Sequence, residues 1–161
     1  MAKQETKTNA MRMLDRAGVP YQVHTYDPGD GLIDGVSVAA KTGQDPGRVY
    51  KTLVAKGAGG GPLVFVIPVA AELDLKKAAR AAGEKSVAMV HVSELLPLTG
   101  YVRGGCSPVG MKKRYPTFFQ REMLELPVVL VSGGRVGVQV ELDPRRLAQV
   151  TEARGADLIR D

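Results

Sequence analysis

The chain of 161 residues contains no tryptophan, and aromatic side chains make up only 5% of it. Stacking of nucleobases on aromatic rings is therefore excluded as a widespread binding device, so any contact with nucleic acid must be mainly electrostatic. The single cysteine, Cys106, excludes an internal disulfide, which favours a reducing compartment. Two histidines and no pair of cysteines leave no zinc-site spacing, and we expect neither a metal nor another cofactor.

Long hydrophobic runs are also missing. No uninterrupted apolar stretch approaches the roughly 20 residues that would span a bilayer, and residues 1–10 are polar and charged. We therefore expect a cytoplasmic protein without membrane contact. The length fits one compact domain over residues 1–161. The net charge of +5 agrees with a polyanionic partner but does not require one.

Hydrophobic spacing and capping residues predict an α+β fold, with a mixed, largely antiparallel sheet packed against several helices. The expected helices are one capped by Thr6 or Thr8 and stopped by Gly18, others over 35–42, 75–82 and from 144 onward, and a helical turn at 93–96. The expected strands cover 19–26, 49–54, 63–67, 87–92, 117–119, 128–131 and 135–142.

Two regions carry more detailed expectations. On the third helix, we expect Leu75 to face the core with the alanines, while Lys76 and Lys77 face solvent. We expect residues 132–134 to connect the last two strands, with Gln139 on the outward face of the second. On the strand over 19–26, His24 is interpreted as a satisfied, half-buried histidine rather than a catalytic one.

Lys51 interrupts a segment, Val49-Tyr50-Lys51-Thr52-Leu53-Val54, that otherwise has the pattern of a buried strand. A lysine on an apolar face must reach solvent, pair with an anion, or point into a cleft where a ligand supplies the negative charge. An edge strand with a solvent-reaching lysine is the simpler alternative. A glycine-rich segment elsewhere in the chain favours the ligand-binding role.

That segment runs from Gly104 through Gly105, Cys106, Ser107 and Pro108 to Lys113, and its composition suits a tight loop that brings backbone N–H groups close to a ligand. It lacks the glycine, lysine and hydroxyl spacing of a P-loop, which disfavours nucleotide hydrolysis. Cys106 is interpreted as a small packing residue rather than a nucleophile, since no cysteine-protease signature surrounds it. Paired carboxylates for glycosidase chemistry are not evident.

Ordered short motifs across nearly the whole chain resemble the YbaK/EbsC family, and in particular its free-standing Cys-tRNA(Pro) deacylases. These are relatives of the editing domain inserted in bacterial prolyl-tRNA synthetases. The motifs are Lys7-Thr8-Asn9-Ala10, His24-Thr25-Tyr26, Val49-Tyr50-Lys51-Thr52-Leu53, Leu73-Asp74-Leu75-Lys76-Lys77, Gly100-Tyr101, Gly104-Gly105-Cys106-Ser107-Pro108 and Ser132-Gly133-Gly134.

The resemblance implies a YbaK-like, partly barrel-like fold and trans-editing, which is hydrolysis of the ester between a wrong amino acid and the 3′-terminal adenosine of tRNA(Pro). A second hydrolytic site is needed because a synthetase pocket cannot reject a near-isosteric small amino acid by binding alone. The partners implied are the acceptor end of tRNA(Pro) and prolyl-tRNA synthetase, with no DNA. In cysteine-specific members, the thiol of the substrate attacks its own ester, so no protein triad is expected.

The expected site residues fall into three groups. Catalytic roles go to Lys51, which matches the essential lysine of the family, and to the backbone donors of Gly104, Gly105 and Ser107. The residues expected to bind the aminoacyl group are Tyr26, Thr52, Cys106, Pro108, Ser132 and Gly133. The residues expected to contact the tRNA backbone are Lys76, Lys77, Lys112, Lys113 and Arg114.

The sequence departs from the family pattern at Asp34, where members often carry an aromatic residue, and this bears on amino-acid preference. Two alternatives stay open at this point. One is a deacylase for another small aminoacyl group, such as that of Ala-tRNA(Pro). The other is a non-catalytic module that binds tRNA or a synthetase, although such a module would not need a lysine held against an apolar face.

Overall fold

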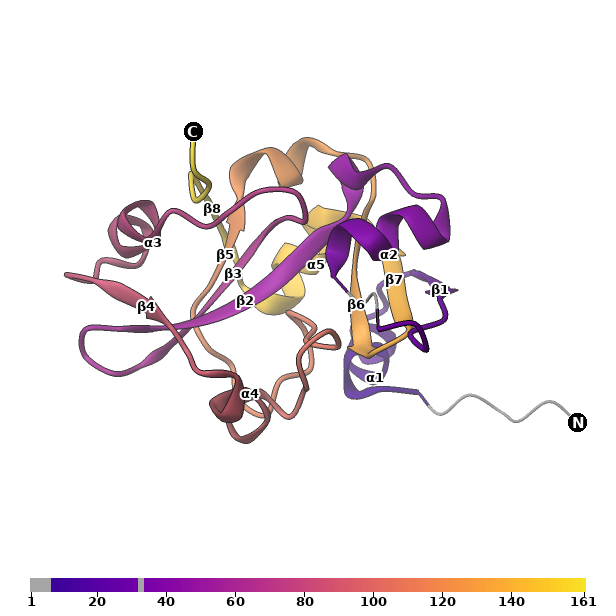
Figure 1. Cartoon of the computed structure of the whole chain (residues 1–161), viewed down its shortest axis with the longest axis horizontal. Helices are drawn as coiled ribbons and strands as arrows, with labels where there is room; N and C mark the ends of the chain where they lie inside the picture. The colour runs from indigo at the N-terminus through magenta and orange to yellow at the C-terminus, as the bar shows by residue number, and fades with distance from the viewer. Residues whose placement is uncertain (1–6, 32–33) are drawn as a thin grey trace, which may run out of the picture.

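The computed structural model describes residues 7–31 and 34–161, and within these ranges the chain forms two β-sheets that stand side by side along its longest axis (Figure 1). The five-stranded sheet has the order β4 (Val87–Met89), β2 (Tyr50–Gly57), β3 (Pro62–Pro68), β5 (Thr117–Gln120) and β8 (Arg154–Ala156). The three-stranded sheet has the order β1 (Gln22–Thr25), β7 (Val138–Leu142) and β6 (Val129–Arg135). The predicted α+β architecture with a mixed sheet is confirmed.

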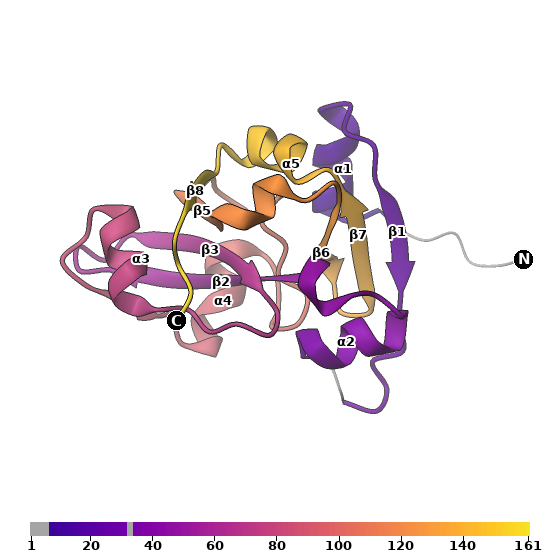
Figure 2. The same cartoon turned by 90° about the horizontal axis from the view of Figure 1, so that it is seen from above.

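Pairing is antiparallel except between β3 and β5 and between β5 and β8. The α-helices are α1 (Asn9–Arg16), α2 (Gly35–Thr42), α3 (Leu75–Ala82), α4 (Val92–Thr99) and α5 (Pro144–Thr151), and the 3-10 helices are η1 (Pro46–Arg48) and η2 (Arg121–Glu125). Helices α1 and α2 lie at opposite ends of the three-stranded sheet (Figure 2). No helix in the described ranges has the length and apolar character needed to cross a membrane.

The central strand β3 divides the core into two clusters because its side chains alternate between the faces of the sheet. Val64 and Val66 pack into a cluster that includes α1 and α5. Phe65 and Ile67 pack on the other side, where the alanines of α3 close the cluster and the rings of Phe65 and Phe118 stack with their centres 5.5 Å apart. The continuous apolar run predicted as a central strand therefore serves both layers.

Helix starts follow the predicted caps. The side chain of Thr8 accepts a hydrogen bond from the N–H of Met11 at 3.1 Å, and Asp74 caps α3 in the same way. Thr6, the alternative cap, lies outside the described residues. α4 is longer than the predicted helical turn because it continues through Pro97, and the predicted strand before it ends earlier, at Met89.

The hairpin between β6 and β7 differs from the prediction. The chain reverses at Val136 and Gly137, where Gly137 has φ +94°, and not at residues 132–134. Gly133 and Gly134 belong to β6, and the register shifts between Ser132 and Arg135, which is a bulge. These glycines therefore accommodate a bulge within a strand and do not form the predicted turn.

On β7 and on α3, the prediction of which side chains face solvent is also wrong. Gln139 is only 5% exposed, because β7 is the middle strand of its sheet and the face that carries Gln139 lies against a cavity. On α3, Leu75 is 40% exposed, whereas Lys77 is drawn in by the C-terminal segment. The Lys77 ammonium lies 2.8 Å from the carbonyl oxygen of Ile159, 2.9 Å from Asp161 and 3.1 Å from Asp157. No pattern within the helix could show this contact, and β8 was likewise not predicted.

Candidate active site

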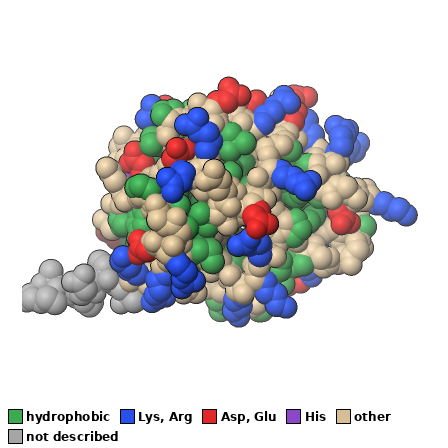
Figure 3. Space-filling model, turned by 180° about the vertical axis from the view of Figure 1, so that it is seen from behind, with side chains coloured by type: hydrophobic (Ala, Val, Ile, Leu, Met, Phe, Trp, Pro, Cys, Tyr) green, Lys and Arg blue, Asp and Glu red, His purple; other side chains and the backbone are tan. Residues whose placement is uncertain are grey.

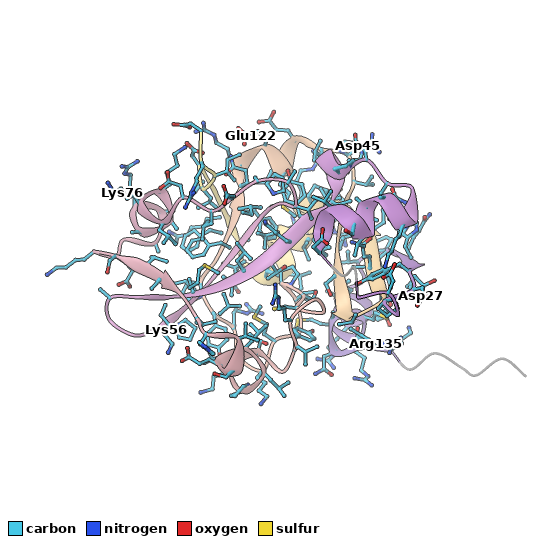
Figure 4. The ribbon with its side chains drawn as sticks, in the orientation of Figure 1. Asp27, Asp45, Lys56, Lys76, Glu122 and Arg135 are labelled. Atoms are coloured by element: carbon cyan, nitrogen blue, oxygen red, sulfur yellow. The ribbon has the colours of Figure 1, made fainter. Side chains whose placement is uncertain are left out.

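A cavity of about 580 Å³ opens where the two sheets meet. Its walls come from β2, the start of α2, the segment from β4 into α4, the glycine loop and the strands β6 and β7. The volume is in the range that suits a small ligand or the end of a larger one. An ion pair between Lys56 of β2 and Glu94 connects β2 to α4, which contributes to one wall. Figure 4 shows Lys56 beside α4, and Arg135 at the β6–β7 end of the molecule.

The middle of β2 lines this cavity, and in the part of the chain that the structure describes one of its edges has no strand partner there. β2 pairs with β3 along its length, but with β4 only from Ala55 to Gly57. Val49, the residue before β2, forms an isolated bridge with Leu130 of β6. Residues 49–54 therefore all line the cavity, including residues of both faces of the strand. This is the segment whose single lysine stood out in the sequence.

Lys51 is half-buried and lines the cavity. Its ammonium group forms no hydrogen bond or ion pair with any residue that the structure describes. Burial lowers the pKa of Lys51 from its usual value, and the charge of Glu72 opposes that shift only in part. A half-buried cation without a partner is unfavourable unless a ligand supplies negative charge or hydrogen-bond acceptors.

Two buried oxygens of residues that line the same cavity also lack partners among the described residues. Among the described residues, the hydroxyl oxygen of Thr52 and the amide oxygen of Gln139 have no hydrogen-bond partner. Both residues line the cavity, together with Ser132, which lies opposite Gln139 in the β6–β7 register. Buried polar atoms are normally satisfied, so unpaired atoms grouped at one cavity indicate a place where a polar ligand binds.

The glycine loop has a defined turn. The N–H of Gly105 donates to the carbonyl of Val102 at 2.9 Å, and Gly104 between them has φ +85°, which favours glycine. A side chain on Gly105 would place its Cβ 2.8 Å from the backbone nitrogen of Val136, so the loop packs backbone to backbone against the β6–β7 turn. The N–H of Gly105 is thus occupied, contrary to the expectation that it faces the substrate.

Other parts of the loop remain suited to binding. Gly104 and Cys106 line the cavity, and neither of their N–H groups has an acceptor among the described residues. Ser107 is fully buried and outside the lining, and Pro108 lines a separate small hollow of about 50 Å³ with Lys113 and Arg114. The loop therefore brings two of its predicted residues to the cavity rather than all of them.

Cys106 is a packing residue in this arrangement. It is 7% exposed, packs with Val54 and Tyr101, and burial raises the pKa of its thiol to about 12. Neither histidine activates it, because His24 pairs with Glu141 at 2.7 Å and His91 caps α4 by accepting from the N–H of Ser93. A thiol that stays protonated at neutral pH is a poor nucleophile.

The remaining residues expected to bind the aminoacyl group divide. Tyr26 lines the cavity, and the Lys41 ammonium lies 5.9 Å from the centre of its ring. Gly133 does not line the cavity, since it is buried against Val138. Asp34 does line it and caps α2, where hydrogen bonds from the N–H and hydroxyl of Ser37 lower the pKa of its carboxyl group.

None of the five residues expected to contact tRNA lines the cavity, and two of them are already paired. Lys77 is held by the C-terminal segment and Arg114 pairs with Glu152. Lys76 lies on α3, across β2 from α4 (Figure 4), whereas Lys112 lies 3.4 Å from the carbonyl oxygen of Pro97 at the end of α4. On the face seen from behind, basic and acidic side chains are interspersed (Figure 3).

The polar lining residues that sequence reasoning missed include Gln139 and Arg103. Gln139 has the spacing of a residue on the outward face of a simple hairpin. Its burial follows from the sheet order, in which β7 lies between β1 and β6. Arg103 had an available signal, because it immediately precedes the glycine pair of the predicted loop. The described residues contain no cluster of three or more histidine, cysteine or acidic side chains that could hold a metal ion.

Comparison with known proteins identifies the family to which the chain is similar. The family model described as "Aminoacyl-tRNA editing domain" matches residues 34–150. A protein of Enterococcus faecalis (strain ATCC 700802 / V583), provisionally named Cys-tRNA(Pro)/Cys-tRNA(Cys) deacylase EbsC, is 44% identical over 160 residues, which cover 98% of each chain.

Solved structures agree with this result. The crystal structure of a protein provisionally described as a trans-editing enzyme for prolyl tRNA synthetase matches with a TM-score of 0.83 and 27% identity, over 98% of this chain and 100% of the other. The crystal structure of the hypothetical protein APE2540 matches with a TM-score of 0.86 and 26% identity, over 94% and 99% of the two chains. The region that matches the family model, residues 34–150, contains every residue of the cavity lining except Tyr26 and Gly31. The chain therefore belongs to the aminoacyl-tRNA editing domain family.

Proposed function

We propose that this protein is a trans-editing aminoacyl-tRNA deacylase that removes cysteine from Cys-tRNA(Pro). The observation that carries the proposal is the group of unpaired polar atoms at one cavity, the Lys51 ammonium and the oxygens of Thr52 and Gln139. The near full-length similarity to the Enterococcus faecalis protein supports cysteine as the amino acid and tRNA(Pro) as a carrier.

The unpaired groups complement the chemistry of an aminoacyl ester. The α-ammonium group of the ester needs acceptors, and the oxygens of Thr52 and Gln139 are acceptors without donors. Lys51 provides a cation for the oxygens of the terminal ribose at the acceptor end. The N–H groups of Gly104 and Cys106 donate to the ester carbonyl oxygen, on which negative charge develops during acyl transfer.

The reaction needs no nucleophile from the protein. The substrate's thiol loses its proton, and its sulfur forms a bond to its own ester carbonyl carbon. The bond from that carbon to the ribose oxygen then breaks, and the ribose oxygen takes up a proton. The products are free tRNA and a small cyclic thioester, which water opens to cysteine. A cysteine-like thiol has a pKa of about 8.5, so an appreciable fraction is ionised near neutral pH.

The editing domain spans the whole chain, residues 1–161, beyond the matched 34–150. The protein acts in the cytoplasm, where tRNA is charged, and works alongside prolyl-tRNA synthetase, as the relative described as its trans-editing enzyme suggests.

A deacylation panel tests the proposal. The purified protein is incubated with tRNA(Pro) that carries cysteine, serine, alanine or proline, and the remaining ester is measured over time. We expect rapid loss of the cysteinyl ester and far slower loss of the seryl ester, because a hydroxyl is almost never ionised at neutral pH. Equal rates for cysteine and serine would refute attack by the substrate thiol, and a preference for alanine would reassign the amino acid.

A further inference from the structure

Arg103 lies at the mouth of the cavity without any role in holding the fold together. It is exposed, it lines the cavity, and it forms no hydrogen bond or ion pair with any described residue. Among the described residues that line the cavity, Asp34 is the one acidic residue, and its carboxylate caps α2. An arginine at a ligand cavity, without a neutralising carboxylate, is suited to an anionic ligand.

The backbone holds Arg103 in a fixed position. It occupies the turn from Val102 to Gly105, which is closed by the hydrogen bond between those residues, and the positive φ of Gly104 follows it directly. The close packing of Gly105 against the backbone of Arg135 and Val136 anchors this turn to the other sheet. A rigid turn reduces the conformational freedom that the arginine loses when it binds.

Part of the cavity lining near α4 is apolar and exposed. Met89 is 46% exposed and Val92 is 59% exposed, and both line the cavity beside α4. An exposed apolar ledge of this kind can pack against the face of a nucleobase. Lys51, this ledge and Arg103 line one cavity, so a nucleoside bound there lies in the same cavity as the arginine.

From this arrangement, and resting on the proposed deacylase function, we infer that Arg103 binds the phosphate that joins the terminal adenosine of the acceptor strand to the preceding nucleotide. The guanidinium group donates hydrogen bonds to the phosphate oxygens, and the adenine base lies against Met89 and Val92. Arg103 is thus a positioning residue that holds the acceptor strand while the ester reacts deeper in the cavity. Lys51 in turn contacts the ribose end.

The test compares two substrates that differ in this phosphate, Cys-tRNA(Pro) and cysteinyl-adenosine. Arg103→Ala is expected to raise KM for Cys-tRNA(Pro) by about tenfold or more, with kcat within about threefold of wild type, since a charge-assisted hydrogen bond is lost in the bound and transition states alike. For cysteinyl-adenosine, kcat/KM stays unchanged. Arg103→Lys restores part of the loss, because a point charge still attracts phosphate.

Arg48→Ala is the matched control. Arg48 is exposed, its side chain has no hydrogen bond or ion pair among the described residues, and it does not line the cavity, so its removal subtracts the same charge without affecting KM. The slope of log kcat/KM against log salt concentration becomes shallower by about 0.7 in Arg103→Ala alone, the value for one contact to a single strand. Thermal unfolding checks that all variants are folded.

Two results would overturn the inference. One is an unchanged KM and salt slope in Arg103→Ala, and the other is an equal loss on cysteinyl-adenosine, which would place Arg103 at the nucleoside or ester. Binding of the trinucleotide CCA is measured in parallel and needs no turnover. A wild type without deacylase activity would refute the proposed function, whereas weakened CCA binding by Arg103→Ala would still support the phosphate contact.

Discussion

Lys51 combines a catalytic expectation with an energetic one at the scale of a single residue. Because burial lowers its pKa in the folded protein, protonation of Lys51 opposes folding. This cost is fully present below the lowered pKa and disappears as the pH rises toward the usual value of 10.5. We therefore predict that Lys51→Met unfolds at a higher temperature than wild type at pH 7, and that this advantage shrinks as the pH approaches that value.

The measurement is the difference in Tm between the two proteins at several pH values, which cancels the titration of other groups. A Lys51→Met protein that is less stable than wild type at pH 7 would show that the ammonium has a stabilising partner in solution.

Lys51→Arg is expected to be as inactive as Lys51→Ala, since a planar fork does not replace a compact ammonium in a confined site.

Cys106 is expected to be dispensable for chemistry, since its buried thiol is protonated at neutral pH. Cys106→Ala should keep kcat/KM within about tenfold of wild type, whereas loss of a nucleophile typically costs several orders of magnitude. The small cavity left behind should lower the free energy of unfolding by about 1 kcal/mol. An inactive but folded Cys106→Ala protein, together with inactivation of wild type by thiol alkylation, would establish protein nucleophile catalysis instead.

At the scale of elements, the sequence was sufficient wherever the determinants are local. The caps at Thr8 and Asp74 and the apolar run of β3 lie within the elements that they define. The position of Gln139 and the pairing of Lys77 depend on which segments pack together, and no periodicity encodes this. The 132–134 glycines were misinterpreted because a bulge and a turn use the same residue types.

A substitution at Gly105 can test whether packing of the glycine loop against the β6–β7 turn positions the site. Gly105→Ala forces a Cβ to within 2.8 Å of the Val136 nitrogen, so we predict a loss of about 1–3 kcal/mol in stability. Activity should fall as well, because the N–H groups of Gly104 and Cys106 shift with the loop. Gly59→Ala is the control, since a Cβ at Gly59 would meet nothing within 4 Å and the φ of Gly59 is not positive. Chemical denaturation of both variants decides, and equal stability would argue against tight packing at Gly105.

At the scale of the whole molecule, the predicted tRNA contacts divide between two regions. Lys112 and Lys113 lie at the end of the glycine-rich segment, whereas Lys76 lies on α3 across β2 from α4. We predict that tRNA binding weakens steeply with salt, and that removing Lys112 and Lys113 flattens this dependence by about 0.9 for each phosphate of a duplex that the protein no longer neutralises. The check is the slope of log Kd against log salt concentration, with Lys76→Ala measured beside it. A slope that no variant changes would contradict a phosphate-binding surface on these residues.

The family and the reaction class could be predicted from ordered motifs that cover nearly the whole chain, because such motifs keep their order and residue types. The cavity itself could not be predicted. It forms where β2 leaves one edge unpaired between the two sheets, and it collects residues from segments as distant as Tyr26 and Gln139. Its shape follows from sheet order rather than from any single segment.

Single-turnover kinetics can decide whether Lys51 and its cavity catalyse deacylation of a mischarged tRNA. Under single-turnover conditions, hydrolysis of Cys-tRNA(Pro) is followed with wild type, with Lys51→Ala and without protein, after thermal unfolding has shown both proteins to be folded. The account predicts rapid deacylation by wild type and a rate for Lys51→Ala lower by at least about 100-fold, near the uncatalysed rate. Near-wild-type turnover by folded Lys51→Ala would contradict it.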